Sequence, residues 1–391
     1  MIVSQKAIGD GIPPAGGGVG VVEVNCHVRS LVVSGAGDVE IDLSNQGPFS
    51  PSPISSWHGA MKCYETRSEG SSESVHSTYI PIIRSGSYAD IGQREVMEDE
   101  HICVDDLSIH LGPIFKSPTS FYGVFDGHGG SAAASYIKKN AIKFFFKDAE
   151  LPQVSIYDPQ FMEELATGHR NAYLLADIAL SAERTVSNTC GTTSLTAIVI
   201  GRRLLIANSG DCRAVLCRNG AALELTQDHR PSLSSERERV ERAGGFIDDG
   251  DYLNGELSVT RALGDWFMKP PLGSFAPLIA DPEVRQLFLS EEDEFLIIGC
   301  DGIWDVLPSQ AAVSLVRRGL RRHDDPERCA RELVMEASRL NSNDNLTAVV
   351  VCFTSPKRHE SCLPQGRRPR FSGVSDEARS RLKCFVESRR A

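Results

Sequence analysis

Apolar runs that stop at acidic, glycine-containing turns dominate the middle of the chain. One of them, residues 121–125, ends directly at Asp126, and glycines at positions 127, 129 and 130 allow the backbone to turn sharply there. Residues 132–147 then have the composition of a helix. A carboxylate in such a turn either caps the helix or faces a ligand, and this segment alone leaves both interpretations open.

The same pattern predicts the other elements. Four apolar runs between residues 193 and 226 are separated by tight glycine turns, which predicts an antiparallel meander. Residues 232–243 are rich in charge and predict an exposed helix. Strands are expected at 87–91, 101–104, 193–200, 203–208, 213–218, 222–226, 294–300 and 346–353, and further helices at 158–184, 310–322 and 326–340.

Composition divides the chain into three parts. Residues 1–80 mix Gly, Ser and Pro without a sustained period, which predicts a flexible N-terminal extension. Residues 81–355 carry the strands and helices and are acidic. The tail, 356–391, holds ten basic and four acidic residues, although the whole chain has a net charge of −11. An acidic middle suits divalent cations better than nucleic acid.

Cysteine spacing and hydropathy limit the class of protein. The eleven cysteines include no CxxC pair, so neither a zinc knuckle nor a disulfide framework is indicated. The start of the chain does not resemble a secretion signal, and no run of eighteen apolar residues occurs. We therefore expect a cytoplasmic or nuclear protein, without membrane association and with free thiols.

Acidic residues recur where the expected strands end. Asp126, Asp301 and Asp344 each adjoin a strong apolar run, and Glu98 and Asp99 lie in a turn between two strands. Each acid alone is compatible with a cap or a turn, but strand ends of a packed sandwich meet at one edge. Carboxylates brought together there need a cation. Oxygen ligands without His or Cys favour magnesium or manganese over zinc.

Six motifs appear in an order and spacing that resemble the metal-dependent type 2C protein serine/threonine phosphatases. The resemblance covers residues 84–354, and finer features resemble a plant subgroup that includes phosphatases described as DNA-binding. The motifs are RxxxED at 94–99, DGHGG at 126–130, SGDCRA at 209–214, RALGD at 261–265, DGIWDV at 301–306 and DNLT at 344–347.

The resemblance implies a fold and an activity. The fold would be α+β, a β-sandwich of two antiparallel sheets flanked by antiparallel helix pairs, formed by a catalytic domain at 81–355. The activity would be hydrolysis of phosphoserine and phosphothreonine monoesters in signal transduction. The implied nucleophile is a water activated by a binuclear Mg²⁺ or Mn²⁺ centre, the implied partners are phosphorylated proteins, and the expected state is a monomer.

It also implies roles for individual residues. Asp211 and Asp305 match acids around a more labile third metal. His128 resembles the general acid that protonates the leaving alkoxide, and its alternative role is a turn histidine that caps a helix. The two central metals would be held by Glu98, Asp99, Asp126, the carbonyl of Gly127, Asp301 and Asp344.

Arg94 would bind the substrate phosphate through its planar guanidinium. The alternative is that Arg94 forms a surface salt bridge with Glu95 or Glu98.

Three other classes of function fit the sequence less well. Four Cys-x5-Arg pairs, at 212/218, 352/358, 362/368 and 384/390, have the spacing used by cysteine-dependent phosphatases, but none is followed by a phosphate-cradling glycine loop and helix. A catalytically inactive binding module would lack some of the matched acids, and all are present. The basic tail, with GRRPR at 366–370, is expected at most to contact DNA weakly.

Overall fold

The computed structural model describes residues 21–22, 31–33, 39–41, 79–269 and 276–353. Three short strands, β1 (Val21–Val22), β2 (Leu31–Val33) and β3 (Val39–Ile41), form an antiparallel sheet within the region predicted as a flexible extension. The remainder of that predicted extension up to residue 78, and the whole of the predicted basic tail, lie outside the described residues.

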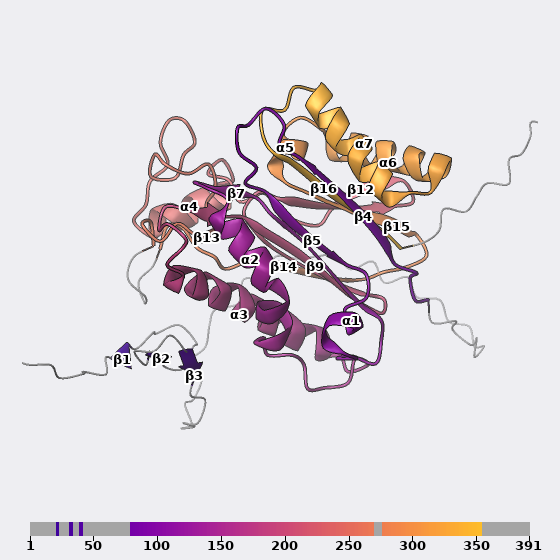
Figure 1. Cartoon of the computed structure of the whole chain (residues 1–391), viewed down its shortest axis with the longest axis horizontal. Coiled ribbons are helices and arrows are strands. Elements are labelled where there is room, and N and C mark those ends of the chain that lie inside the picture. The colour runs from indigo at the N-terminus through magenta and orange to yellow at the C-terminus, as the bar shows by residue number, and fades with distance from the viewer. Residues whose placement is uncertain (1–20, 23–30, 34–38, 42–78, 270–275, 354–391) are drawn as a thin grey trace, which may run out of the picture.

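Two five-stranded antiparallel sheets lie face to face between two pairs of helices (Figure 1). This is the predicted α-β-β-α sandwich. One sheet has the order β14 (Glu283–Phe288), β10 (Arg203–Ser209), β9 (Ser194–Ile200), β6 (Thr119–Phe125) and β5 (Glu100–Val104). The other has the order β12 (Ala221–Glu224), β11 (Arg213–Arg218), β15 (Asp293–Gly299), β16 (Leu346–Cys352) and β4 (Arg84–Asp90).

Helices cover the outer face of each sheet. The first sheet is covered by α2 (Ala132–Ile142) and α3 (Phe161–Ala182), and a π-helix, η1 (Lys143–Lys147), extends α2 as far as the predicted helix end. The second sheet is covered by α6 (Ser309–His323) and α7 (Pro326–Arg339). Among the described residues, no helix has the length and apolar character required to cross a bilayer.

Alternation along β6 explains the two hydrophobic layers. Tyr122 and Val124 point into the space between the sheets, whereas Phe121 and Phe125 pack under α2 and α3. All seven residues of β6 are buried, which accounts for the unbroken apolar run in the sequence.

The predicted meander is wrong as a single unit. The strands form two hairpins, β9–β10 in one sheet and β11–β12 in the other. The chain crosses between the sheets at Gly210, where φ is +120° and a Cβ atom would overlap Thr193. Apolar periodicity identifies strands but does not specify which sheet each one joins.

The charged helix α4 (Ser234–Arg242) is not exposed on every side, contrary to the prediction. Glu236 is only 3% exposed; its Oε1 accepts a 2.6 Å bond from Arg261, and its Oε2 accepts bonds from Arg239 and Thr260. Burial alone would raise the pKa of Glu236, but the two guanidinium groups outweigh burial and lower this pKa to about 2.

We expect Glu236→Gln to lower the free energy of unfolding by about 3 kcal/mol at pH 7. Because the folded-state pKa lies below the ordinary value, Glu236 stabilises the folded protein above pH 4.5 and loses this effect as the pH falls toward 2. Urea titrations at pH 7 and at about pH 3 measure the stabilising contribution of Glu236 and its loss in acid. Glu238→Gln is the matched control, since Glu238 is exposed on the same helix. Equal losses in the two variants would contradict this account.

Candidate metal centre

Four predicted acidic residues meet at one edge of the sandwich. Asp126 follows β6, Asp211 lies in the crossing between the sheets, and Asp301 opens the short helix α5 (Asp301–Trp304). Carboxylate oxygens of these three lie within 4.8 Å of one another. Asp99, just before β5, lies equally close to Asp126 on its other side. Both sheets therefore contribute to one acidic cluster.

Glycines beside the acids allow this close approach. A Cβ atom at Gly127 would overlap the carbonyl oxygen of Glu98, and one at Gly302 would overlap the carbonyl oxygen of Asn345. The Asp-Gly pairs thus bring the strand-end turns of neighbouring strands into backbone contact. In addition, β7 (Gly127–His128) pairs with β8 (Gly191–Thr192), and β8 pairs with β13 (Leu263–Gly264), in a small third sheet beside the cluster.

Burial and mutual repulsion perturb the acids strongly. Burial first, and then the charges of Asp99 and Asp301, raise the pKa of Asp126 well above its ordinary range. The pKa of Asp301 is raised similarly, by burial and then by Asp211 and Asp305. Burial raises the pKa of Asp99 to about 6, although a 2.7 Å hydrogen bond from the Thr347 hydroxyl favours the ionised form. A divalent cation would relieve all three shifts.

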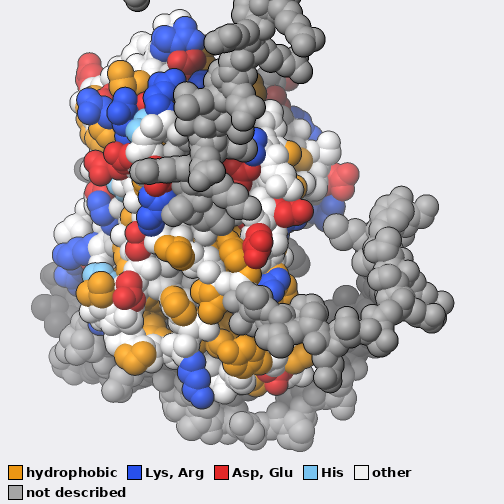
Figure 2. All heavy atoms as spheres, turned by 90° about the vertical axis from the view of Figure 1, so that its right-hand side faces the viewer, with side chains coloured by type: hydrophobic (Ala, Val, Ile, Leu, Met, Phe, Trp, Pro, Cys, Tyr) orange, Lys and Arg blue, Asp and Glu red, His pale blue; other side chains and the backbone are white. Residues whose placement is uncertain are grey.

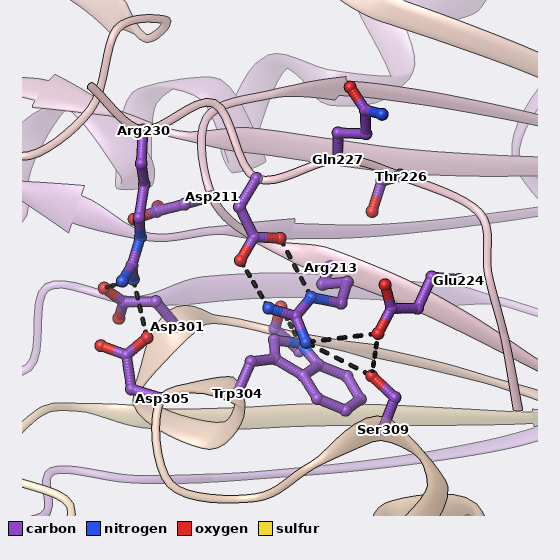
Figure 3. Close-up of polar contacts among 12 residues, drawn as sticks. Asp211, Arg213, Glu224, Thr226, Gln227, Arg230, Asp301, Trp304, Asp305 and Ser309 are labelled. Atoms are coloured by element: carbon purple, nitrogen blue, oxygen red, sulfur yellow. Dashed lines mark hydrogen bonds and ion pairs between the residues drawn. The ribbon is translucent and has the colours of Figure 1, made fainter. Parts of the chain in front are cut away.

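An arginine that the sequence did not single out compensates the outer part of the cluster. The Arg230 guanidinium contacts Asp211 at 2.9 Å, Asp301 at 3.1 Å and Asp305 at 2.9 Å (Figure 3). By contrast, the largest charges acting on Asp126 are all carboxylates. The inner part of the cluster, around Asp126 and Asp99, is therefore the part that fits a bound metal best.

We expect Arg230→Gln to lower the free energy of unfolding by about 2 kcal/mol in chelator, because Asp211 and Asp301 lose a cation while they remain largely buried. The loss is smaller than for a fully buried pair, since the Arg230 side chain is 30% exposed. Thermal unfolding in chelator and in Mg²⁺ tests this, with Arg237→Gln, at an exposed ion pair, as the control. An unchanged unfolding temperature for Arg230→Gln would contradict the assignment.

Glu98 and Asp344 lie beside the cluster rather than within it. Glu98 accepts a 2.6 Å hydrogen bond from the Gly130 amide. Asp344 forms a 2.7 Å ion pair with Arg94, whose side chain is 52% exposed. The predicted alternative partners of Arg94, Glu95 and Glu98, are thus replaced by Asp344.

His128 is half-buried and contacts a buried acid. Its Nε2 lies 2.7 Å from Oδ2 of Asp265, a fully buried residue with a φ of +52°. Gly191 leaves the space for this contact, because a Cβ atom there would overlap Asp265. The alternative role of His128 as a helix cap is wrong, since Ser131 occupies the N-cap position of α2.

Cysteine lies closer to the acids than the sequence suggested. The Cys300 sulfur is within 4.8 Å of Asp99 and Asp126 oxygens, which corrects the assumption that no Cys adjoins the oxygen ligands. Burial raises the pKa of the Cys300 thiol well above its ordinary value, so the thiol stays protonated and is a poor ligand. Burial does the same for Cys212, which argues against a cysteine nucleophile.

Sequence reasoning missed Arg230, Asp265 and Cys300 as members of this site. Asp265 stands in the recognised RALGD motif and could have been considered from it, and Cys300 directly precedes Asp301. No local pattern around Arg230 indicates that its side chain reaches the acids.

Comparisons with known proteins give consistent matches. The family model described as "Protein phosphatase 2C" matches residues 84–346. The chain is 50% identical to "Probable protein phosphatase 2C 13" of Arabidopsis thaliana, over 99% of both chains. It is 57% identical to "Probable protein phosphatase 2C 47" of Oryza sativa subsp. japonica, over 80% of this chain and 82% of the relative.

A solved structure supports the fold. The crystal structure of serine-threonine phosphatase 2C from Toxoplasma gondii superposes with a TM-score of 0.59 and 24% identity, covering 72% of this chain and 99% of that one. At this identity the similarity concerns the arrangement of sheets and helices.

Proposed function

The chain belongs to the protein phosphatase 2C family of metal-dependent serine/threonine phosphatases, and from this premise we propose that it hydrolyses phosphoserine and phosphothreonine in proteins with two Mg²⁺ or Mn²⁺ ions. The observation that carries the proposal is the cluster of Asp126, Asp211 and Asp301, whose oxygens lie within 4.8 Å of one another. A catalytically inactive binding module would not need to retain buried carboxylates at such an electrostatic cost.

Residues from both sheets would hold the metals. Bound there, the ions would supply Lewis acidity, lower the pKa of a water and offset charge on the phosphoryl oxygens. We place a third metal at Asp211 and Asp305, and it would bind more weakly because Arg230 already offsets the charges of these two acids. The proposed ligands of the central pair are Glu98, Asp99, Asp126, the Gly127 carbonyl, Asp301 and Asp344.

Arg94 and His128 would act on the substrate. The exposed Arg94 guanidinium, which pairs with Asp344, would offer two parallel hydrogen bonds to phosphate oxygens. His128 would protonate the departing serine or threonine oxygen. Because its Nε2 contacts Asp265, its Nδ1 is the nitrogen left to donate this proton.

We expect phosphate release from a phosphothreonine peptide to require Mn²⁺ or Mg²⁺ and to stop in excess chelator. A colorimetric phosphate assay over a metal titration measures this, and Ca²⁺, a larger ion with a looser geometry, serves as the comparison. Full activity in chelator, or none with either metal in a folded protein, would overturn the proposal.

Three statements from the sequence remain predictions. They are contact between DNA and the tail at 356–391, a monomeric state, and a cytoplasmic or nuclear location. Deletion of the tail should weaken DNA binding and reduce its salt dependence if the first is correct.

A further inference from the structure

The C-terminal half of α6 carries several arginines. Basic side chains, mixed with some acidic ones, collect in the upper part of the face shown in Figure 2. Arg317 is held in place by a 2.8 Å bond to Glu294 and lies against Gly220, in the turn between β11 and β12. Arg318 follows Arg317 directly, Arg321 lies about one turn further along the helix, and both are exposed. With Gly220 and Ser314, these three arginines line a hollow of about 380 Å³.

Two of the three charges in this hollow, those of Arg318 and Arg321, have no acidic partner among the described residues, whereas Arg317 pairs with Glu294. Within the described part of the chain, neither Arg318 nor Arg321 has a carboxylate within ion-pair distance, and the acid whose charge interacts with Arg318, Glu336, is itself paired with Arg339 at 2.6 Å. Two exposed arginines of the neighbouring α7 do find acidic partners, since Arg328 pairs with Glu332 and Arg339 with Glu336. The third, Arg331, lies over the ring of Tyr88.

Two simpler explanations account for only part of the cluster. The helix dipole favours cations in the last turn of a helix, which covers Arg321 but not Arg317 or Arg318, one turn earlier. On a basic face that is only solvated, the like charges would be spaced apart. Here Arg317 and Arg318 stand four and three residues before Arg321, a spacing at which like charges on a helix repel one another. A fixed arginine beside two unmatched ones, around a hollow, suits a doubly charged anion.

We propose that this hollow binds a second phosphorylated side chain of a protein substrate while the metal centre hydrolyses the first. The inference rests on the proposed phosphatase activity. A phosphate with the side chain that carries it fits the hollow, whose volume of about 380 Å³ is many times the roughly 10 to 15 Å³ that one water molecule needs on the same measure.

The position of the hollow sets the spacing of the two phosphates. Strand β11 begins two residues after Asp211 and ends two residues before Gly220, so the metal centre and the hollow lie at opposite ends of a six-residue strand. At about 3.3 Å per residue the separation is on the order of 20 Å. An extended substrate needs at least about six residues between its phosphorylated positions to reach both.

Direct binding tests the hollow without catalysis. We expect a fluorescent peptide with one phosphothreonine to bind the protein in chelator about tenfold more weakly after the double change Arg318→Gln and Arg321→Gln. The matched control is Arg328→Gln with Arg331→Gln, which removes the same charge from exposed positions of α7 and should leave binding unchanged. Equal weakening in both double variants, or equal binding of the unphosphorylated peptide, would refute a specific phosphate site.

Hydrolysis of doubly phosphorylated peptides tests the spacing. With Mn²⁺ present, KM should fall severalfold once the phosphates are separated by about six residues or more, and only for protein with Arg318 and Arg321 intact. Hydrolysis of a small aryl phosphate should be the same for wild type and the double variant. If wild type hydrolyses the aryl phosphate but spacing has no effect on KM, only this inference fails. No hydrolysis of either substrate would instead refute the phosphatase proposal.

Discussion

Asp126→Asn should reduce metal-dependent phosphate release from a phosphothreonine peptide by at least about 100-fold, because Asp126 stands in both groups of clustered ligand atoms. The same change should stabilise the protein in chelator. Burial and neighbouring acids raise the pKa of Asp126 well above its ordinary value, so the ionised carboxylate destabilises the folded state. Asn removes this carboxylate and with it the repulsion from the neighbouring acids.

The opposite signs of the two effects make this variant informative. Phosphate release, together with thermal unfolding in chelator, measures both, and Asp249→Asn at an exposed position should change neither. Retained activity with metal would exclude Asp126 as a ligand. Loss of activity together with loss of stability would indicate misfolding rather than a missing ligand.

His128→Gln should lower kcat for a phosphothreonine peptide by roughly 100-fold or more and should change hydrolysis of an aryl phosphate much less. The reason is the leaving group: an alkoxide needs a proton as it departs, whereas a phenolate with a low pKa does not. Gln keeps a polar side chain beside Asp265, so the buried carboxylate retains a hydrogen-bond partner.

Steady-state assays on the two substrates measure this selectivity, and His110→Gln, at an exposed position on the helix α1 (Ser108–Leu111), is the control. Equal losses on both substrates would assign His128 a role in maintaining the site rather than in proton transfer.

The sequence predicted the elements with strong periodicity. The buried strands, and the helices α6 and α7, lie within a few residues of their expected positions, since long apolar runs and amphipathic stripes report burial directly. The strand β14 was missed because its sequence, EVRQLF, does not alternate, contains only three apolar residues and lies at the edge of its sheet. The short helix α5 is a single turn and has no periodicity to detect.

The site was predictable to the extent that its residues stand at strand ends. Asp126 and Asp301 could be placed together because buried strands of one sandwich end at a common edge. Arg230 and Asp265 come from segments without regular structure, and their contacts with Asp211 and His128 depend on how the chain crosses between the sheets. Such contacts follow from tertiary packing and leave no periodic signal in the sequence.

The two-sheet origin of the acidic cluster has a mechanical consequence. Asp126 follows a strand of one sheet and Asp301 lies just after a strand of the other, yet their carboxylate oxygens lie within 4.8 Å of each other. An ion bound by both carboxylates would connect the two sheets in the manner of a cross-link. Because it binds only the folded protein, the free energy of unfolding would increase with the free concentration of the ion. Chelators and denaturants should therefore both lower the free energy of unfolding, because removing the ion also removes the connection between the two sheets.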